Sequence, residues 1–271
     1  MPAWAAPTQC PAYFAGGVAP TITNLKLKAR TQEICFEAFA VLHSGLSRTA
    51  LYSAEHLTRA TLNAAKKLSR KDSYHREPSL PEQDRAELSD YARSSYDRGH
   101  LSPNADFATR SAQAESFSLA NMVPQTHANN AGVWAGIESA TRKLATSEGE
   151  LYVVSGPVFQ GADIEKVGRV LVPTQLWKVL YSPKQQRAGA YVSNNDTTGT
   201  YSTLTVSELE KIIGVSLLPG LSQNLRDAGM DLPKPSAQRG RQKKSKAIQE
   251  EFMLQDFSRS IIETIKRTGQ H

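Results

Sequence analysis

The chain has 271 residues, of which 39% are hydrophobic and 21% are charged, a composition ordinary for a soluble globular protein of one large domain or two modest ones. Its net charge of +6 favours a polyanionic partner, although a charge of this size can also serve solubility alone. No apolar run reaches the roughly 20 residues that cross a bilayer, so no membrane partner is expected.

The N-terminal residues carry features of an exported protein. Ala3-Trp4-Ala5 fits the small-x-small pattern of a signal-peptidase site, which suggests a start near a cleavage junction and predicts a periplasmic or secreted location. The alternative is an Ala-rich segment without a targeting role. Cys10 and Cys35 are the only cysteines, and an even pair in an exported chain suggests a disulfide. In a reducing compartment both would be thiols, and a zinc site is disfavoured because no CxxC pair is present.

The first ninety residues combine a strand, a helical segment and a polar loop. The apolar run 34–42 predicts one buried strand. Residues 53–68 predict a helical or turn-like segment, with three leucines on a plausible face: Leu57, Leu62 and Leu68. Residues 67–90 are polar and include two prolines, which predicts a surface loop with a short helix.

The second half of the chain contains the clearer strands. Residues 129–147 predict an amphipathic helix, because apolar residues recur three or four positions apart, at Val133, Ile137, Ala140 and Leu144. Short apolar, β-branched runs predict strands in four segments: 151–156, 170–173, 176–181 and 188–193. Residues 206–213 predict a short helix. Since strands and helices do not alternate regularly, we expect an α+β fold with a central, mostly antiparallel sheet flanked by helices.

The composition changes near the C-terminus. Residues 233–246 hold six Lys or Arg and no acidic residue, which predicts a flexible basic linker that either contacts a phosphate backbone or is simply solvated. Helical spacing returns in residues 252–265. We therefore expect an N-terminal arm over 1–29, a main domain over 30–218 and a C-terminal extension over 219–271.

The segment Asp97-Arg98-Gly99-His100 is the most informative in the chain. A histidine can take a proton from water near neutral pH, and an arginine beside it can offset negative charge on a phosphate. The glycine permits a backbone conformation that a β-carbon would resist. Four such residues alone are a weak signal, since a lone histidine more often serves a structural hydrogen bond.

A second cluster, residues 121–138, strengthens that signal. Asn130 and Glu138 are eight positions apart, which on a helix is about two turns and some 12 Å of rise, so they share one face without touching. Their side chains offer oxygen atoms, which suit a hard cation such as Mg²⁺ that keeps most of its waters. We therefore expect Mg²⁺ as cofactor, with Mn²⁺ as a substitute.

In these motifs the chain resembles the DNA/RNA non-specific endonuclease family, the sugar-non-specific relatives of endonuclease G. The family's Asp-Arg-Gly-His motif stands at 97–100, followed by Leu101-x-Pro103 and Asp106, and its Asn-x-x-Pro-Gln element stands at 121–125. The resemblance covers roughly residues 30–218 and continues through 154–159 and 173–178. It implies a ββα-metal (His-Me) finger at the active site, in which two strands and a helix hold the catalytic groups.

The resemblance also implies roles for five residues. His100 would be the general base, and Asn130 the direct protein ligand of Mg²⁺. Arg98 would stabilise the transition state, Glu138 would hold the metal's water shell, and Asn121 would orient nearby groups. The reaction would be hydrolysis of DNA and RNA to products with a 5′-phosphate, and a protein inhibitor would be a conceivable partner. The oligomeric state is left open.

Several neighbouring residues compete for these roles. The family's phosphate-binding arginine would be Arg70, with Arg76 as the competitor. Asp97 would steer Arg98 or be a turn residue, and Asn129 would be a helix cap. His127 is expected to be a surface histidine, and Trp134 a core residue.

Two other function classes stay open from the sequence. A phosphodiesterase acting on small nucleotides would have a closed pocket, whereas a nuclease for polymers would have an open basic groove. A non-catalytic nucleic-acid-binding protein would have lost His100 or Asn130, and both are present.

Overall fold

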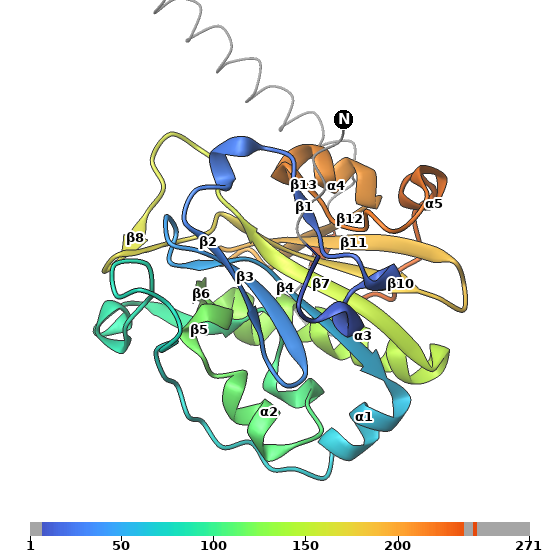
Figure 1. Ribbon diagram of the computed structural model, residues 1–271, viewed down its shortest axis with the longest axis horizontal. Helices are drawn as coiled ribbons and strands as arrows, with labels where there is room; N and C mark the ends of the chain where they lie inside the picture. The colour runs from blue at the N-terminus through green and yellow to red at the C-terminus, as the bar shows by residue number, and fades with distance from the viewer. Residues whose placement is uncertain (1–6, 236–240, 243–271) are drawn as a thin grey trace, which may run out of the picture.

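The computed structural model describes residues 7–235 and 241–242 (Figure 1). Within this part of the chain an eight-stranded sheet has the order β14-β12-β11-β10-β7-β4-β3-β2, and every neighbouring pair is antiparallel except β12 and β14. Its strands are β2 (Thr31–Cys35), β3 (Phe39–Ser44), β4 (Thr49–Thr58), β7 (Glu150–Val158), β10 (Gln175–Ser182), β11 (Arg187–Asn194), β12 (Thr200–Leu204) and β14 (Arg241–Gln242). The predicted α+β class with a mostly antiparallel central sheet is confirmed.

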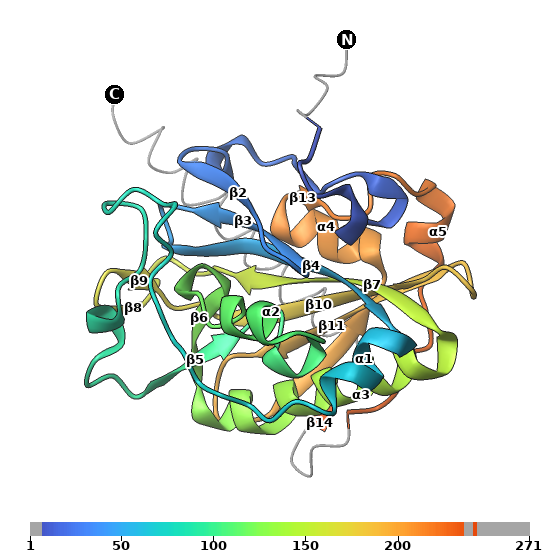
Figure 2. The same ribbon diagram turned by 60° about the horizontal axis from the view of Figure 1, so that its bottom comes forward.

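Both faces of the sheet are buried, because apolar residues alternate toward two separate cores. On β10, Trp177 and Val179 belong to one core, whereas Leu176 and Leu180 belong to the other. The first face is covered by the N-terminal segment and helix α4 (Val206–Ile213), with α5 (Gln223–Ala228) beside α4 (Figure 2). The second face of the sheet is covered by three helices: α1 (Arg59–Ala65), α2 (Arg110–Glu115) and α3 (Ala135–Glu148).

The remaining strands form three small pairs. They are β5 (Tyr96–His100) with β6 (Met122–Thr126), β8 (Lys166–Val167) with β9 (Val170–Leu171), and β1 (Thr21–Ile22) with β13 (Val215–Ser216). The first of these pairs lies on the second face of the sheet and carries the Asp97–His100 segment (Figure 2).

Two predictions for the first half of the chain are wrong in detail. The single strand over 34–42 is a hairpin, in which β2 ends and β3 begins across a turn closed by Phe36 N donating to Phe39 O. The helical segment over 53–68 is strand β4 as far as Thr58, whose side chain then caps α1 by accepting from Thr61 N. An apolar run has no periodicity that separates one strand from two, and this caused the first error.

The later predictions hold better. Helix α4 spans the predicted residues 206–213, and the segments predicted as strands overlap β7, β9, β10 and β11. Residues 67–90 form a loop ending in a short 3-10 helix, Leu88–Tyr91. The helix over 129–147 is interrupted, because residues Asn129–Trp134 form a π-helical turn with Gly132 outside helical geometry, and α3 begins only at Ala135.

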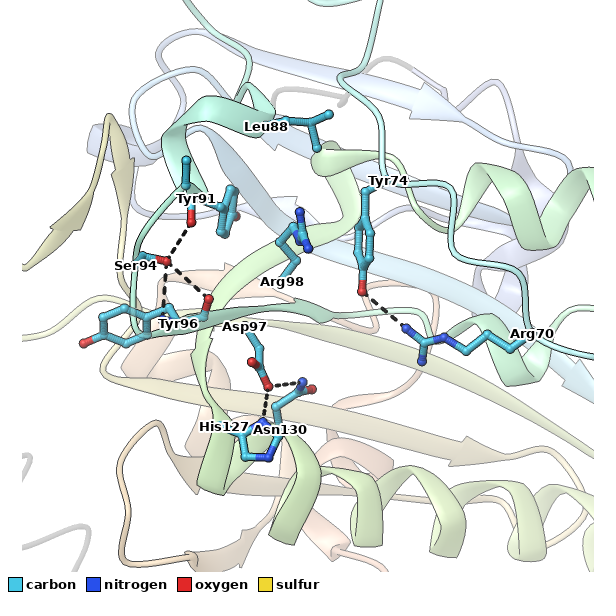
Figure 3. Close-up of a pocket in the computed structure, with 11 residues that line it drawn as sticks. Arg70, Tyr74, Leu88, Tyr91, Ser94, Tyr96, Asp97, Arg98, His127 and Asn130 are labelled. Atoms are coloured by element: carbon cyan, nitrogen blue, oxygen red, sulfur yellow. Dashed lines mark hydrogen bonds and ion pairs between the residues drawn. The ribbon is translucent and has the colours of Figure 1, made fainter.

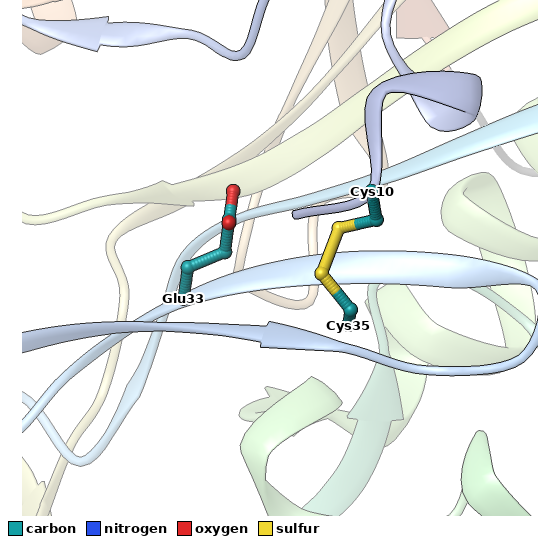
Figure 4. Close-up of side chains that lie close together, drawn as sticks. All are labelled: Cys10, Glu33 and Cys35. Atoms are coloured by element: carbon teal, nitrogen blue, oxygen red, sulfur yellow. A yellow bond between two sulfur atoms is a disulfide. The ribbon is translucent and has the colours of Figure 1, made fainter. Parts of the chain in front are cut away.

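The N-terminal segment is fastened to the sheet. Cys10 and Cys35 form the predicted disulfide (Figure 4), with their Cα atoms 5.9 Å apart. Phe14, four residues after Cys10, lies in the core. Glu33 lies near the two sulfurs, but its carboxylate accepts hydrogen bonds from Thr8 Oγ1 and Gln9 N. The sulfurs are bonded to each other, so this cluster is not a metal site.

Some predictions fall where the structure describes no side chain. The signal-peptidase pattern in residues 3–5 and the helix over 252–265 lie outside the described residues, as does most of the basic linker. From that linker, Arg241 and Gln242 pair in parallel with Thr200 and Tyr201. None of the helices in the described ranges combines the length and apolar character needed to span a membrane.

Candidate active site

The β5–β6 hairpin and α3 together form a two-strand-and-helix unit. The antiparallel register runs from Tyr96 opposite Thr126 to His100 opposite Met122. The chain then enters the π-helical turn that carries Asn130 and continues into α3, which carries Glu138. Because the chain is kinked at Gly132, Asn130 and Glu138 do not lie on one straight helix. The prediction that they share one face of a regular helix is therefore wrong.

Gly99 is needed for a reason other than backbone freedom. Its φ is not in the left-handed region, but a β-carbon there would lie 1.8 Å from Gln125 Oε1 on the paired strand. Gln125 crosses at this point to donate a hydrogen bond from Nε2 to Asn129 Oδ1. The glycine therefore makes room for a buried side chain next to His100.

His100 lies at the end of β5, and its side chain is packed between aromatic rings. The Phe117 ring stands edge-on to it with centroids 5.0 Å apart, and Tyr74 lies 6.2 Å away. Burial, assisted by the positive charge of Arg70, lowers the pKa of His100 to about 3. The imidazole is therefore neutral at pH 7, and its Nε2 is buried with no hydrogen-bond partner in the described residues.

Asn121 is fully buried directly behind His100. Its Oδ1 accepts from Ser102 N at 3.1 Å, and its Nδ2 donates to the carbonyls of Ser102 and Ser116 at 2.8 and 3.0 Å. These bonds fix the turn that follows β5. Asn121 does not line the cavity described below, and its orienting role stays a prediction.

The side chain of Asn130 is oriented by Asp97. Asn130 Nδ2 donates to Asp97 Oδ2 at 2.9 Å, and the exposed His127 contacts the same oxygen through Nδ1 at 2.9 Å. Asn130 Oδ1 accepts no hydrogen bond from the described part of the chain and is left available. Asp97 therefore holds Asn130. Of its two expected roles, it is not a turn residue, because it lies within β5, and no contact with Arg98 is found in the described part of the chain.

Asn129 is not the predicted helix cap. It is fully buried, and its Nδ2 donates to Ser193 Oγ and Asn194 O at 3.2 and 2.6 Å, which ties the π-helical turn to β11. His127 is a surface histidine as predicted, and Trp134 is the predicted core residue, with its Nε1 donating to His100 O at 3.1 Å.

A cavity of about 610 Å³ lies beside this unit, lined by both charged and aromatic residues. Arg98 lies over the Tyr74 ring, 4.1 Å from its centroid, and Arg70 Nη2 donates to the Tyr74 hydroxyl at 3.3 Å (Figure 3). Among the described residues, Arg98 has no carboxylate partner. Arg70 and Asn130 also line the cavity, whereas the competing Arg76 does not and instead lies 4.0 Å from Glu87.

Glu138 faces a buried charged cluster. Arg142 lies one turn further along α3, 4.0 Å from the Glu138 carboxylate and 2.9 Å from that of Asp106. Burial raises the pKa of Glu138 to about 7, although Arg142 and Lys178 act in the opposite direction. At pH 7 the carboxyl is therefore about equally divided between its neutral and ionised forms.

Sequence reasoning missed several members of this arrangement. Arg142 had a visible signal, since it stands four positions after Glu138 on a predicted helix. Lys178 lies in the segment 173–178 of the family resemblance, which gave it no role. Tyr74 and Glu55 had no signal, because they come from the loop and β4, which only tertiary packing brings to the site.

Comparison with known proteins agrees with this geometry. Residues 19–224 match the model of a family described as DNA/RNA non-specific endonuclease. The chain belongs to this family. The named resemblance is thereby confirmed, and so is a nuclease function at the level of the family.

The relatives are nucleases from distant organisms. Nuclease C1 of Cunninghamella echinulata var. echinulata is 31% identical over 68% of this chain and 82% of its own length. The mitochondrial nuclease EXOG of Danio rerio is 34% identical over 66% of this chain, but only 59% of its own length is matched. A Nostoc sp. nuclease is 32% identical over 69% and 73% of the two chains.

A solved structure shares the fold. The crystal structure of the EndoG/EndoGI complex matches with a TM-score of 0.65 and covers 82% of this chain and 96% of its own. At 20% identity this match supports the fold alone.

Proposed function

We propose that the protein is a Mg²⁺-dependent endonuclease that hydrolyses DNA and RNA without sequence preference, with His100 as general base. The observation that carries the proposal is the convergence of three features on one hairpin-and-helix unit. A neutral imidazole ends β5, an amide oxygen of Asn130 is left free by the Asp97 contact, and two arginines line the adjoining cavity.

The residues present fit a divalent cation. Asn130 Oδ1 is unpartnered in the described ranges while its Nδ2 is held, so the amide presents an oxygen ligand in a fixed orientation. Glu138 would hold water molecules of the ion's shell, and Mn²⁺ would substitute for Mg²⁺. When bound, the cation would supply positive charge at the phosphate and the leaving oxygen.

His100 would take a proton from the attacking water. Its Nε2 is buried against aromatic rings, which leaves Nδ1 as the nitrogen able to meet that water. The neutral form needed for this step is the form that burial favours. The water oxygen would bond to phosphorus as the bond to the 3′-oxygen breaks, which leaves a 5′-phosphate on one product.

Arg98 and Arg70 would contact the phosphate group. Arg98 is held by the Tyr74 ring and not by an acid, so its guanidinium keeps its hydrogen-bond donors for an anion. Phosphates are the same at every nucleotide, so a site that relies on these contacts does not read base sequence.

A cleavage assay tests the proposal. Purified wild type and His100→Ala would be incubated with supercoiled plasmid and with RNA, in Mg²⁺, Mn²⁺ or EDTA. We expect wild type to cut both polymers only with metal, and His100→Ala to bind nucleic acid but lose nearly all cleavage. Full activity of His100→Ala would remove His100 as the base, and activity in EDTA would remove the metal.

Two biological features belong to the same proposal. A periplasmic or secreted location is supported by the Cys10–Cys35 disulfide, which persists in oxidising compartments. A protein inhibitor is supported by the similar fold of an EndoG that is bound to EndoGI. Fractionation of the producing cells, and pull-down with the His100→Ala variant, would test the two.

A further inference from the structure

Three consecutive backbone carbonyls at the end of β5, those of residues 100–102, are each held by a side chain from a different element. The donors, in order, are Trp134 Nε1 at 3.1 Å, Lys178 Nζ at 3.1 Å and Asn121 Nδ2 at 2.8 Å. We call this set the carbonyl clamp. It fixes the backbone from which the imidazole of His100 projects.

Lys178 differs from the other two members of the clamp. Trp134 ends the π-helical turn that comes after β6, and Asn121 immediately precedes β6, whereas Lys178 comes from β10 in the middle of the central sheet. It therefore ties the hairpin to the rigid part of the fold. Its side chain is 1% exposed and does not line the cavity, so it cannot contact a nucleic acid.

A buried ammonium group needs compensation, because leaving water costs free energy. Lys178 Nζ also donates to Ser155 Oγ at 2.6 Å and lies 5.2 Å from the centroid of the Trp134 ring. Glu55 is 1% exposed, with neither carboxylate oxygen hydrogen-bonded among the described residues. Burial raises the pKa of Glu55 well above its ordinary value, and Lys178 only partly offsets this effect. The compensation for the ammonium group therefore comes from the Leu101 carbonyl, Ser155 and the Trp134 ring.

Apolar residues often replace such buried charges without loss of stability. Lys178 instead donates a hydrogen bond to the carbonyl of Leu101, the residue after His100, which suits a role in fixing the position of the His100 backbone. We propose that Lys178 is a positioning residue for catalysis. Through its hydrogen bond to the Leu101 carbonyl it keeps His100 correctly placed relative to Asn130 and Glu138. This inference rests on the proposed function of His100 as base.

Kinetics of Lys178→Met test the role. Losing one clamp donor should lower kcat about 10- to 100-fold, since displacement of a catalytic group by about an ångström has effects of this size, while KM for nucleic acid stays unchanged. Ser155→Ala is the matched control, because it removes the other Nζ partner and leaves the Leu101 contact; it should stay within about twofold of wild type. Lys178→Gln, too short to reach the carbonyl, should behave like Lys178→Met and serves if the latter does not fold.

A double-mutant cycle separates positioning from a general structural role. In the His100→Ala background, with plasmid nicking followed over long incubations, the Lys178 substitution should cost little more, because the group that it positions is absent. A full 10- to 100-fold loss in that background, or an unchanged kcat in the single variant, would overturn the proposal.

A second readout does not depend on cleavage. In protein labelled with ¹⁵N-histidine, the His100 signals should shift or broaden in Lys178→Met, while those of His43, buried elsewhere, stay the same. Unchanged His100 signals would rule out the clamp. If wild type cuts no polymer but these signals respond, the proposed function fails and the structural role of Lys178 stands.

Discussion

Asp97 Oδ2 accepts a 2.9 Å hydrogen bond from Asn130 Nδ2, and this single contact decides which atom of the amide is left for a ligand. An amide that can rotate presents NH₂ as readily as oxygen, and NH₂ cannot bind a cation. The acidic residue of the Asp97–His100 segment thus acts on Asn130, and not on its arginine neighbour.

Asp97→Ala should therefore weaken metal activation. We expect the Mg²⁺ concentration for half-maximal cleavage to rise about 10- to 100-fold, as for loss of a group that orients a metal ligand, with much of the rate regained at saturating metal. His127→Ala is the control, since it removes the other partner of Asp97 and leaves Asn130 held. Equal effects of the two variants would argue against the orienting role.

The pKa of Glu138 predicts a pH dependence of metal binding. Burial raises this pKa to about 7, so the carboxyl is protonated below pH 7 and must release its proton when a cation binds. Apparent metal affinity should then fall about tenfold for each pH unit below 7. Metal titrations at pH 6, 7 and 8 would measure this slope, and Glu138→Gln should flatten it. A slope that persists in Glu138→Gln would assign it to another group.

The pKa of His100 predicts a pH dependence of stability. Because the folded-state pKa, about 3, lies below the unfolded value of about 6.5, the stabilising contribution is complete above pH 6.5 and is lost as the pH falls toward 3. The loss should be about 1.4 kcal/mol per pH unit from this group. Urea unfolding at pH 7, 5.5 and 4.5 should show a steeper decline for wild type than for His100→Ala. Equal declines in the two proteins would indicate that protonation of His100 does not lower the free energy of unfolding.

Gly99→Ala should disrupt the site by steric conflict. The added carbon would lie 1.8 Å from Gln125 Oε1, so the Gln125 side chain must leave its contact with Asn129. We expect a loss of about 1–3 kcal/mol in the free energy of unfolding together with most of the activity. Thermal unfolding and the plasmid assay would measure both. Unchanged stability and activity would mean that β5 and β6 can move apart to accept the methyl group without loss of free energy.

The Cys10–Cys35 disulfide should stabilise the fold without serving catalysis. It closes a loop with a sequence separation of 25 residues, for which restriction of the unfolded chain predicts about 3.5 kcal/mol. Replacing both cysteines by serine should lower the free energy of unfolding by this order, as measured by denaturant titration. Neither cysteine lines the cavity, so kcat at 25 °C should stay near that of wild type. A large fall in kcat with the protein folded would link the N-terminal segment to the site.

The sequence by itself determined the family of the protein and much of its secondary structure. The Asp97–His100 segment and the 121–138 cluster identified the family, because these residue types stand in the order of the family's motifs. The helix over 206–213 and the strands at 151–156 and 188–193 could be predicted, since hydrophobic periodicity is a local property of the chain.

Only the tertiary structure decided how these residues act. Nothing local to Asp97 shows that it binds Asn130, and nothing local to Gly99 shows that Gln125 crosses beside it. Glu55 and Lys178 lie on different strands, β4 and β10, and only folding buries both side chains. Burial and contacts between distant elements set the pKa values of His100 and Glu138, because desolvation depends on the whole packed fold and not on sequence neighbours.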